Sequence, residues 1–442
     1  MGFLFGFLKF TKVKMNKNKL SLLIFFFFFI AKPCVAQMVI GSSFEKLNIG
    51  PLLEYTEDKE GNLTIDEIIS EHRNSKINWK KSTSSYLGFG FTQSVYWVRF
   101  NLKNEHQETI NLLINQEYPL IDYIYLYYPE NGSDYKEIKA GDKYQFSKRP
   151  IHYKSFLFPL SLKPNESKIF YLRFQTTSSM NISLSLWNPT VFNSSREAES
   201  SLLWMFYGVI AVMFIFNFCT WFYSKESPYL YYVLFIGAFG LLMMSLNGIG
   251  YQFLWPNSVY WENISNAVLI PVLALSLIQF ARKIVQSKKY NPRIDLTLRL
   301  LSGIFICILL FTIAFNSDRY GMIFATITGG FAAVFGFFVT GYIAFSKKPN
   351  YRLGRFFFAA FSFFATGVFI FVLKALTILP INFFTQYAIQ IGATIQIVLL
   401  SLILLDRLSI LKSQLTLLNI NLEKKVEERT QKLKTAQKDL LN

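Results

Sequence analysis

The residues best suited to bind a small molecule lie in the first half of the 442-residue chain. Trp97 and Tyr118 offer aromatic faces for stacking, and Arg149 and His152 offer hydrogen-bonding groups. This combination suits a sugar or another small organic ligand, so we treat the four as candidate ligand-binding residues. Two plainer interpretations stay open. Trp97 and Tyr118 could fill a hydrophobic core, and Arg149 could pair with the nearby Asp142.

The same region offers little that supports catalysis or metal binding. The histidines at positions 72, 106 and 152 are widely separated, and no Ser-His-Asp or paired-carboxylate spacing stands out. Two of the three cysteines, Cys219 and Cys307, lie inside apolar stretches. The sequence therefore predicts neither a disulfide framework nor a cysteine zinc site. We expect no catalytic residue, no metal and no cofactor.

The composition of the whole chain is that of a membrane protein. Hydrophobic residues make up 52% of it, aromatic residues 18%, and the mean hydropathy is +0.29, which is unlike a soluble enzyme. A net charge of +17 would suggest nucleic-acid binding in a soluble protein. Here Lys and Arg collect at the N-terminus, in short loops between apolar stretches and in the tail, the pattern set by the cytoplasmic face of a membrane. The expected partner is a lipid bilayer and not nucleic acid.

Residues 1–36 are predicted to be a signal peptide. A basic segment at residues 15–19 precedes the apolar run LSLLIFFFFFIA, and Val35-Ala36 offers a small-residue cleavage point before Gln37. Met15 is an alternative start of translation. The segment that follows is therefore expected to be exported.

Residues 37–195 are predicted to form an exported all-β domain, a jelly roll or β-sandwich. A short helix is expected after Thr64, because Thr64 and Glu67 have the spacing of a capping box. Strand-like segments with alternating apolar residues follow, at residues 96–102, 110–116, 122–128, 155–162, 169–175 and 180–187. Turn residues separate them, as in antiparallel sandwiches, at Asn131-Gly132, Gly141-Asp142 and Pro164-Asn165.

Residues 201–405 are predicted to form a seven-helix transmembrane bundle. Seven apolar stretches are long enough to cross about 30 Å of hydrocarbon, at residues 201–223, 229–247, 267–285, 300–315, 320–345, 356–379 and 388–405. Basic residues crowd one set of connecting loops, whereas the alternate set contains Arg319 alone. The positive-inside rule therefore predicts a cytoplasmic C-terminus and an extracytoplasmic β domain. This orientation agrees with the signal peptide and with an odd number of spans.

Several polar residues inside these stretches are uncharged, and we expect them to form hydrogen bonds between helices. They are Asn217, Asn247, Gln279, Gln390 and Gln396. No half-helix pair or internal repeat suggests a transporter. A transporter or channel with an extracytoplasmic capture domain is nevertheless the alternative to a receptor, and an envelope scaffold without a ligand is a third interpretation.

Residues 406–442 are predicted to form a cytoplasmic, dimeric coiled coil. Apolar residues recur at alternating three- and four-residue steps, the a/d pattern of paired helices. The first phase comprises Leu408, Leu411, Leu415, Leu418 and Leu422, and the second comprises Val426, Leu433, Ala436 and Leu440. The four-residue step from Leu422 to Val426 shifts the phase, as a stutter does. The shift either lets rotation or register change during signalling or marks an imperfect dimer helix.

Several motifs follow one another along the chain in a specific order. The exported part contains YWVR at residues 96–99, YP at 118–119 with ID at 121–122, and GD at 141–142 leading to FSKRP at 146–150. The membrane part contains SPYLYYVLFIGAFGLLMMSLNGIGYQFLWP at 227–256 and IGATIQIVLLSLILLDRL at 391–408, and the tail contains LEKKVEERTQKL at 422–433. From about Asn62 onward, the chain resembles the bacterial seven-transmembrane receptors with diverse intracellular signalling modules, in the form that carries a type 2 extracellular domain.

The resemblance implies a receptor of the bacterial inner membrane that senses an extracytoplasmic, carbohydrate-like ligand and signals through its coiled coil to a cytoplasmic partner. Such receptors usually continue into a histidine kinase, diguanylate cyclase or phosphatase. No histidine follows His152 and no nucleotide-binding glycine loop follows Leu405, so we expect no enzyme activity in this chain. Either an output domain follows in a longer protein, or the coiled coil contacts a separate signalling partner.

Overall fold

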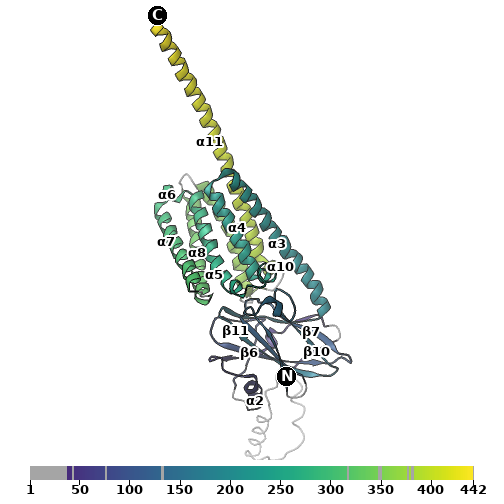
Figure 1. Cartoon of the computed structure of the whole chain (residues 1–442). Coiled ribbons are helices and arrows are strands. Elements are labelled where there is room, and N and C mark those ends of the chain that lie inside the picture. The colour runs from purple at the N-terminus through teal and green to yellow at the C-terminus, as the bar shows by residue number, and fades with distance from the viewer. Residues whose placement is uncertain are drawn as a thin grey trace, which may run out of the picture.

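The computed structural model describes residues 37–41, 44–74, 77–130, 134–315, 318–346, 351–375, 378–379 and 383–441. The predicted signal peptide and the Asn131-Gly132 turn lie outside these residues. A β domain lies at one end of a helical bundle, and a single long helix projects from the other end (Figure 1). This arrangement confirms the predicted fold class.

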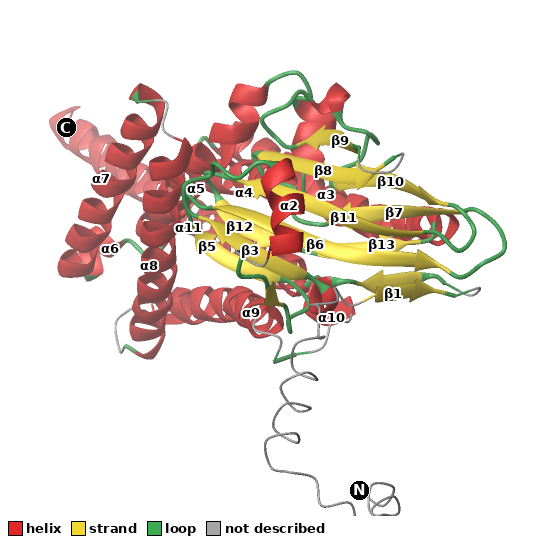
Figure 2. Cartoon of the chain, turned by 90° about the horizontal axis from the view of Figure 1, so that it is seen from below, coloured by secondary structure: helices red, strands yellow, loops and turns green. Residues whose placement is uncertain are grey.

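The β domain contains two larger sheets and a two-stranded ribbon (Figure 2). Its strands are β1 (Gln37–Ile40), β2 (Lys46–Asn48), β3 (Glu54–Asp58), β4 (Lys80–Lys81), β5 (Leu87–Phe91), β6 (Val95–Asn104), β7 (Ile110–Gln116), β8 (Tyr123–Pro129), β9 (Tyr135–Ala140), β10 (Phe156–Leu162), β11 (Ser167–Gln175), β12 (Ser179–Ile182) and β13 (Leu184–Trp187). The large sheet has the order β4-β3-β6-β11-β8-β9, with β1 parallel to the end of β6. The small sheet has the order β10-β7-β13-β2, and β12 pairs with β5.

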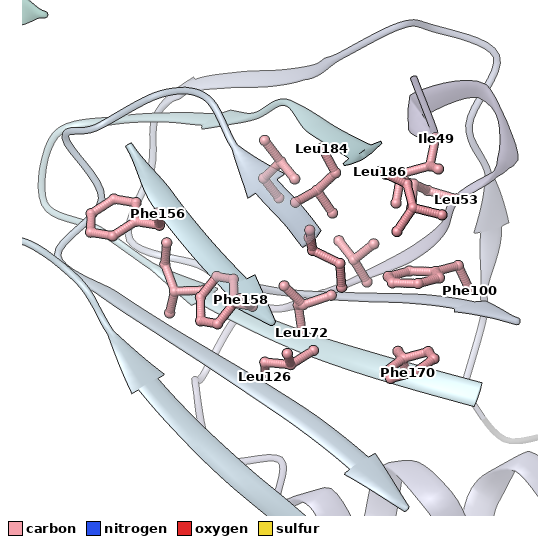
Figure 3. Close-up of a cluster of buried hydrophobic side chains, with 14 of the residues drawn as sticks. Ile49, Leu53, Phe100, Leu126, Phe156, Phe158, Phe170, Leu172, Leu184 and Leu186 are labelled. Atoms are coloured by element: carbon pink, nitrogen blue, oxygen red, sulfur yellow. The ribbon is translucent and has the colours of Figure 1, made fainter. Parts of the chain in front are cut away.

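Apolar side chains from the facing sheets form the core of the β domain (Figure 3). Alternation along the strands turns Phe100 of β6 and Phe170 of β11 to the same side, where their rings stack with centroids 5.4 Å apart. Phe158, Leu172 and Leu184 lie in the same cluster and are fully buried. Each such side chain stabilises the fold by about 1.5–3 kcal/mol through burial alone.

All six predicted strands form, but residues 180–187 do not make one strand. They divide into β12 and β13, which enter different sheets. The break lies at Ser183, whose amide donates to Gln116 Oε1 at 2.8 Å and whose carbonyl accepts from the Glu117 amide at 3.0 Å. The predictions missed β1 to β5 and β9, since these strands are short or carry many charged residues.

A short helix, α2 (Ile65–Asn74), covers part of the large sheet on the face opposite the core. Its predicted capping box is confirmed. The Thr64 amide donates to Glu67 Oε2 at 2.8 Å, and the Glu67 amide donates to Thr64 Oγ1 at 3.4 Å. These contacts satisfy amides that the first turn of a helix leaves without partners.

Seven helices correspond to the seven predicted apolar stretches. They are α3 (Pro189–Ser224), α4 (Ser227–Leu246), α5 (Val259–Ile284), α7 (Pro292–Ala314), α8 (Asp318–Phe345), α9 (Tyr351–Ala375) and α11 (Ala388–Leu441). Among the described residues, six are long and apolar enough to cross a membrane by length and composition, and α9 contributes a shorter apolar stretch, Gly354–Ile370. The connections include a π-type turn η3 (Gly250–Leu254) and the short helices α6 (Ser287–Tyr290) and α10 (Phe383–Gln386).

Helix α3 begins inside the segment predicted to belong to the β domain. It starts at Pro189, directly after β13, with Asn188 as N-cap accepting from the Thr190 amide at 2.9 Å. Asn followed by Pro at the first helical position is a common helix start. Phe192 in the first turn packs edge-on against Tyr153 and Trp187 of the β domain. One uninterrupted helix therefore connects the β domain to the bundle.

Helix α11 is held closely on two sides within the bundle. On the α9 side a Cβ on Gly367 would lie 2.4 Å from the Ala388 carbonyl oxygen, so this contact requires glycine. On the α4 side, the Tyr229 hydroxyl donates to the Leu404 carbonyl at 2.6 Å, and the Tyr232 hydroxyl donates to the Ile397 carbonyl.

The remainder of α11 leaves the bundle. Its described side chains are exposed from Ser409 onward.

Among the described residues, the predicted hydrogen bonds between helices form at three of the five uncharged positions. Asn217 Nδ2 donates to Ser401 Oγ at 3.1 Å, which joins α3 to α11. Asn247 and Gln279 donate to Tyr207 and Ser302 at 2.8 Å and 3.2 Å. Side-chain polar groups therefore join helix pairs inside the bundle.

Candidate functional site at the junction of the two parts

A loop of the β domain, residues 141–154, meets residues 247–266, which comprise the connection between α4 and α5 and the first two turns of α5. Three hydrogen bonds join the two segments. The Tyr251 hydroxyl donates to the Tyr144 carbonyl at 2.6 Å, and the Phe146 amide donates to the Pro256 carbonyl at 3.3 Å. Asn263 Nδ2 donates to the Asp142 carbonyl at 3.4 Å. We call this contact region the junction.

Gly248 brings the end of α4 against the β domain. Its backbone has φ of +71°, the left-handed conformation that glycine adopts after a helix. A Cβ at this position would lie 2.4 Å from the Lys154 carbonyl oxygen and 3.0 Å from Pro119 Cβ. A residue with a side chain would therefore both strain the backbone and push the two parts of the molecule apart.

Arg149 lies at the centre of the junction and is 4% exposed. Its Nη1 donates to the Tyr153 and Lys154 carbonyls at 2.7 Å and 3.0 Å. Its guanidinium also packs over aromatic rings, at 4.4 Å from Phe156 and 5.6 Å from Tyr251. Burial lowers the pKa of Arg149 to about 10, against the opposing influence of nearby acidic groups. The side chain therefore stays a cation at neutral pH.

Two buried carboxyl groups face this region. Glu262, in the first turn of α5, accepts from Trp255 Nε1 at 2.6 Å through one oxygen. Five buried polar atoms in this region have no hydrogen-bond partner among the described residues. They are the other oxygen of Glu262, Asp142 Oδ1, Asn266 Oδ1, Arg149 Nε and Arg149 Nη2. Burial raises the pKa of Asp142 well above its usual range, and the charges of Asp122 and Glu262 act in the same direction.

These unpartnered atoms make the junction energetically unusual. Leaving a buried polar group without a partner costs about 1–3 kcal/mol. A cavity of about 20 Å³ lies among Asp122, Asp142, Glu262 and Asn266, which is room for about one water molecule. Perturbed, incompletely paired charges are typical of functional sites. A small movement of one part against the other would change which groups are paired.

The structure brings together three of the four predicted ligand-binding residues. Arg149 is central, and no hydrogen bond joins it to Asp142 among the described residues. His152 is exposed on the same loop, with a ring nitrogen 3.4 Å from the Ser147 carbonyl. Tyr118 precedes Pro119, which lies against Gly248. Burial and then the charge of Asp142 raise the pKa of Tyr118 to about 12.

Trp97 lies elsewhere. It is fully buried on the α2 side of the large sheet, where its ring stacks on Tyr127 with centroids 5.7 Å apart. This position agrees with the open alternative that Trp97 fills a core. Ligand binding by any of the four residues stays a prediction.

Sequence reasoning missed the bundle side of the junction. Glu262, Asn266, Tyr251 and Trp255 were not among the predicted site residues. A signal for one of them was present, since Glu262 is the only acidic residue between Glu226 and Asp295. A lone carboxyl group between two apolar stretches marks a functional position by default.

The predicted coiled-coil positions lie on α11. Leu408 packs against the bundle. Leu415, Leu418, Leu422, Val426 and Leu433 are exposed in the single chain. The side chains of Leu411 and Leu440 lie outside the described residues. Dimerisation through these positions stays a prediction.

Two family models match the chain. One, described as 7TM diverse intracellular signalling, matches residues 199–407, and the other, described as 7TMR-DISM extracellular 2, matches residues 50–188. The junction joins the two matched domains, with Asp142 and Arg149 in one and Gly248 and Glu262 in the other. Both family descriptions are those of domains of sensory receptors. No curated protein matches the chain.

Proposed function

The chain belongs to the seven-transmembrane receptors with diverse intracellular signalling modules, with their type 2 extracellular domain, and from this we propose how it carries a signal. A ligand bound by the extracellular domain changes the pairing at the junction, and the change reaches α11 through the helices. The junction is the point of entry because it is the described contact in which charged groups of both parts are buried together.

One observation carries this proposal, which is the position of α4. At one end of α4, Gly248 touches the extracellular domain at Lys154. At the other end, Tyr229 and Tyr232 donate to carbonyl groups of α11. A shift or rotation of α4 would therefore be felt directly by the helix that leaves the bundle. The π-type turn η3 after Gly248 supports such a movement, because such turns often occur at functional sites.

We place the output of the receptor at the projecting part of α11. The basic connection between α5 and α7, which contains α6, lies at the end of the bundle opposite the extracellular domain (Figure 1). The positive-inside rule would therefore put α11 in the cytoplasm of a bacterium, with the bundle in the inner membrane. Exposed leucines along α11 support a parallel homodimer with a second copy of the chain. The paired helices would then act on a cytoplasmic signalling partner.

A surface for a carbohydrate-like ligand is supported by tyrosines on the outer face of the large sheet. Tyr123 and Tyr125 have stacked rings with centroids 6.4 Å apart, and the Tyr125 and Tyr144 hydroxyls are 3.3 Å apart. Arg173 lies over the Tyr125 ring. Aromatic faces beside hydrogen-bonding groups suit sugar rings. The surface adjoins the junction, because the Tyr144 carbonyl accepts from Tyr251.

Disulfide crosslinking of α11 tests the proposal. The full chain, with its native cysteines replaced by serine, is reconstituted in liposomes with Leu418→Cys, and Ser413→Cys on the outer side of the same heptad serves as control. Leu418→Cys should crosslink faster than Ser413→Cys. Adding Gly248→Ala should change the Leu418→Cys yield by about fivefold or more, as expected for coupled sites.

The matched control for Gly248→Ala is Gly303→Ala. A Cβ at Gly303 would meet nothing within 4 Å, so this change should leave the crosslinking yield unaltered. Equal crosslinking at positions 413 and 418 would refute the dimer. An unchanged yield in Gly248→Ala would refute coupling through α4.

A further inference from the structure

A second cavity lies at the ends of strands β7 and β10 of the extracellular domain, with residues of both sheets in its lining. Its volume is about 350 Å³, within the range of small-molecule sites. Strands β7 and β10 of the small sheet and β8 and β11 of the large sheet form its walls, and Pro189, the first residue of α3, completes them. None of the four predicted ligand-binding residues lines this cavity.

The small sheet is narrow beside this cavity, because its strands have unequal lengths. Strand β7 has seven residues, whereas β13 has four, and their pairing runs from Gln116 only as far as Leu113. After Trp187 the chain turns into α3, so Asn111 and Leu112 of β7 lie beyond the end of β13. The small sheet is narrower there than the large sheet that it covers.

The chemistry of the walls limits what can bind. Leu112, Leu160 and Phe170 are buried and apolar, and Tyr128 adds a half-buried aromatic ring. Lys168 is the only charged residue in the lining, and its ammonium group is 2.9 Å from Glu166 Oε1. Apolar walls with a single cation at the edge suit a molecule that has an apolar body and one anionic end.

We propose that this cavity binds a small organic carboxylate whose body is an aromatic ring or a short aliphatic chain. The body would lie against Leu160 and Phe170, and the carboxylate would accept hydrogen bonds from Lys168. A sugar is a poorer fit, because Asn111 and Ser161 could pair with only a few of its hydroxyl groups and the others would face leucine, proline and phenylalanine. The site differs in chemistry and place from the tyrosine surface beside the junction.

The position of the cavity gives binding a consequence, and this part rests on the proposed receptor function. Pro189 in the wall is the first residue of a helix that runs without interruption to Ser224. Leu113, also in the wall, packs in one cluster with Trp187 and with Phe192 of α3. A molecule in the cavity would therefore press on α3 at its start.

The test uses the full chain in lipid nanodiscs and 4-(trifluoromethyl)phenylacetate as probe, followed by fluorine NMR. The wild-type chain should show saturable binding. Lys168→Gln should weaken binding by about tenfold, the effect of losing one charge-assisted hydrogen bond of about 1.5 kcal/mol. Ser161→Trp, at an exposed position of the lining, should reduce binding by obstructing the mouth of the cavity.

Two controls distinguish binding in the cavity from attraction to surface charge in general and from partition of the probe into lipid. Lys103 forms the same kind of ion pair, 2.9 Å from Glu105, but does not line the cavity, so Lys103→Gln should bind the probe like wild type. The uncharged amide of the probe should bind wild type and Lys168→Gln equally.

Two results would overturn the inference. One is the absence of saturable probe binding with a dissociation constant of about 1 mM or lower. The other is an equal effect of Lys168→Gln and Lys103→Gln. The Leu418→Cys crosslinking assay tests the receptor function separately. If Gly248→Ala alters the crosslinking but the probe does not bind, the cavity site alone is refuted. Probe binding without altered crosslinking would keep the site and remove its signalling role.

Discussion

Buried carboxyl groups lie near arginine at both ends of the bundle, but only at one end are both oxygens of the carboxyl group hydrogen-bonded. At the end away from the extracellular domain, Asp295 accepts from Arg282 Nε at 2.9 Å, from Ser287 Oγ at 2.6 Å and from Arg299 Nε at 2.7 Å. At the junction, Asp142 and Glu262 each keep one buried oxygen without a partner among the described residues.

This difference separates a fixed end from a changeable one. A network in which every group is paired loses hydrogen bonds in any other arrangement, so it specifies one geometry. A network with unpartnered groups can gain pairs by moving, so two arrangements can lie close in free energy. We therefore expect the Asp295 network to act as a fixed support and the junction to respond to the extracellular domain.

The largest effect is expected from Asp295→Ala. The change removes the acceptor for two arginines and leaves Arg282 partly buried without its counter-charge. Breaking such a pair costs about 3–5 kcal/mol of the free energy of unfolding. Thermal unfolding of the reconstituted chain measures the loss. Glu226→Ala, at an exposed acid on the same side of the bundle, should change little, and equal losses in the two variants would contradict the comparison.

The next effect is expected at the junction from Gly248→Ala. A non-glycine residue in this left-handed conformation costs about 1–3 kcal/mol, and its Cβ would also meet the Lys154 carbonyl. Hydrogen exchange should speed up in residues 142–154 and 247–266 and stay unchanged around Asp295. Gly303→Ala is the control. Faster exchange spread evenly over the whole bundle would argue against a local junction.

Asp142→Asn should act in the opposite direction and depend on pH. The raised pKa of Asp142 means that the folded chain holds this proton more tightly than the unfolded chain. Its stabilising contribution is full below the unfolded pKa of about 3.9 and is lost as the pH rises through the raised pKa.

Asparagine resembles the neutral acid, so the free energy of unfolding of the variant should exceed that of wild type by about 1 kcal/mol at pH 8 and equal it at pH 4. Thermal unfolding at the two pH values measures the difference. The exposed Asp134→Asn is the control. The same shift at both pH values would rule out titration of Asp142 as the cause.

The smallest effect is expected from Tyr232→Phe. The change removes the hydrogen bond to the Ile397 carbonyl but keeps the ring, which stacks on Phe280 at 4.9 Å. We expect a loss of about 1 kcal/mol in the free energy of unfolding. The crosslinking yield at Leu418→Cys should change more in this variant than in Tyr231→Phe. If both tyrosine variants behave alike, α4 does not hold α11 through this hydroxyl.

Most of the fold could be predicted because the strongest signals are local. Apolar stretches of membrane length located all seven helices, and alternating residues located β6, β7 and β11. These local signals failed for one strand with few apolar residues and for a strand break that depends on a residue distant in sequence. Strand β9 has a charged outer face and few apolar residues, and the break at Ser183 depends on Gln116, which is distant in sequence.

The junction could be predicted only on one side. Arg149 was found from its chemistry, but its surroundings come from α5 and from the turn after α4. The contact between Asp142 and Asn263 joins residues 121 positions apart, so no local pattern contains it. Trp97 shows the converse limit, since an aromatic residue in a strand has the same sequence signal whether it faces a ligand or the underside of α2.

The uninterrupted course of α11 turns small displacements into large ones. The tyrosines of α4 grip it between Ile397 and Leu404, and the helix continues to Leu441, a further length of about 55 Å. A tilt of α11 inside the bundle therefore displaces the far end of this segment by a much larger distance. A tilt of about 5° at the grip would carry the far tip through about 5 Å, roughly the rise of one helical turn. Amplification of this kind would let two buried, sparsely paired side chains at the junction direct an assembly at the far end of the molecule.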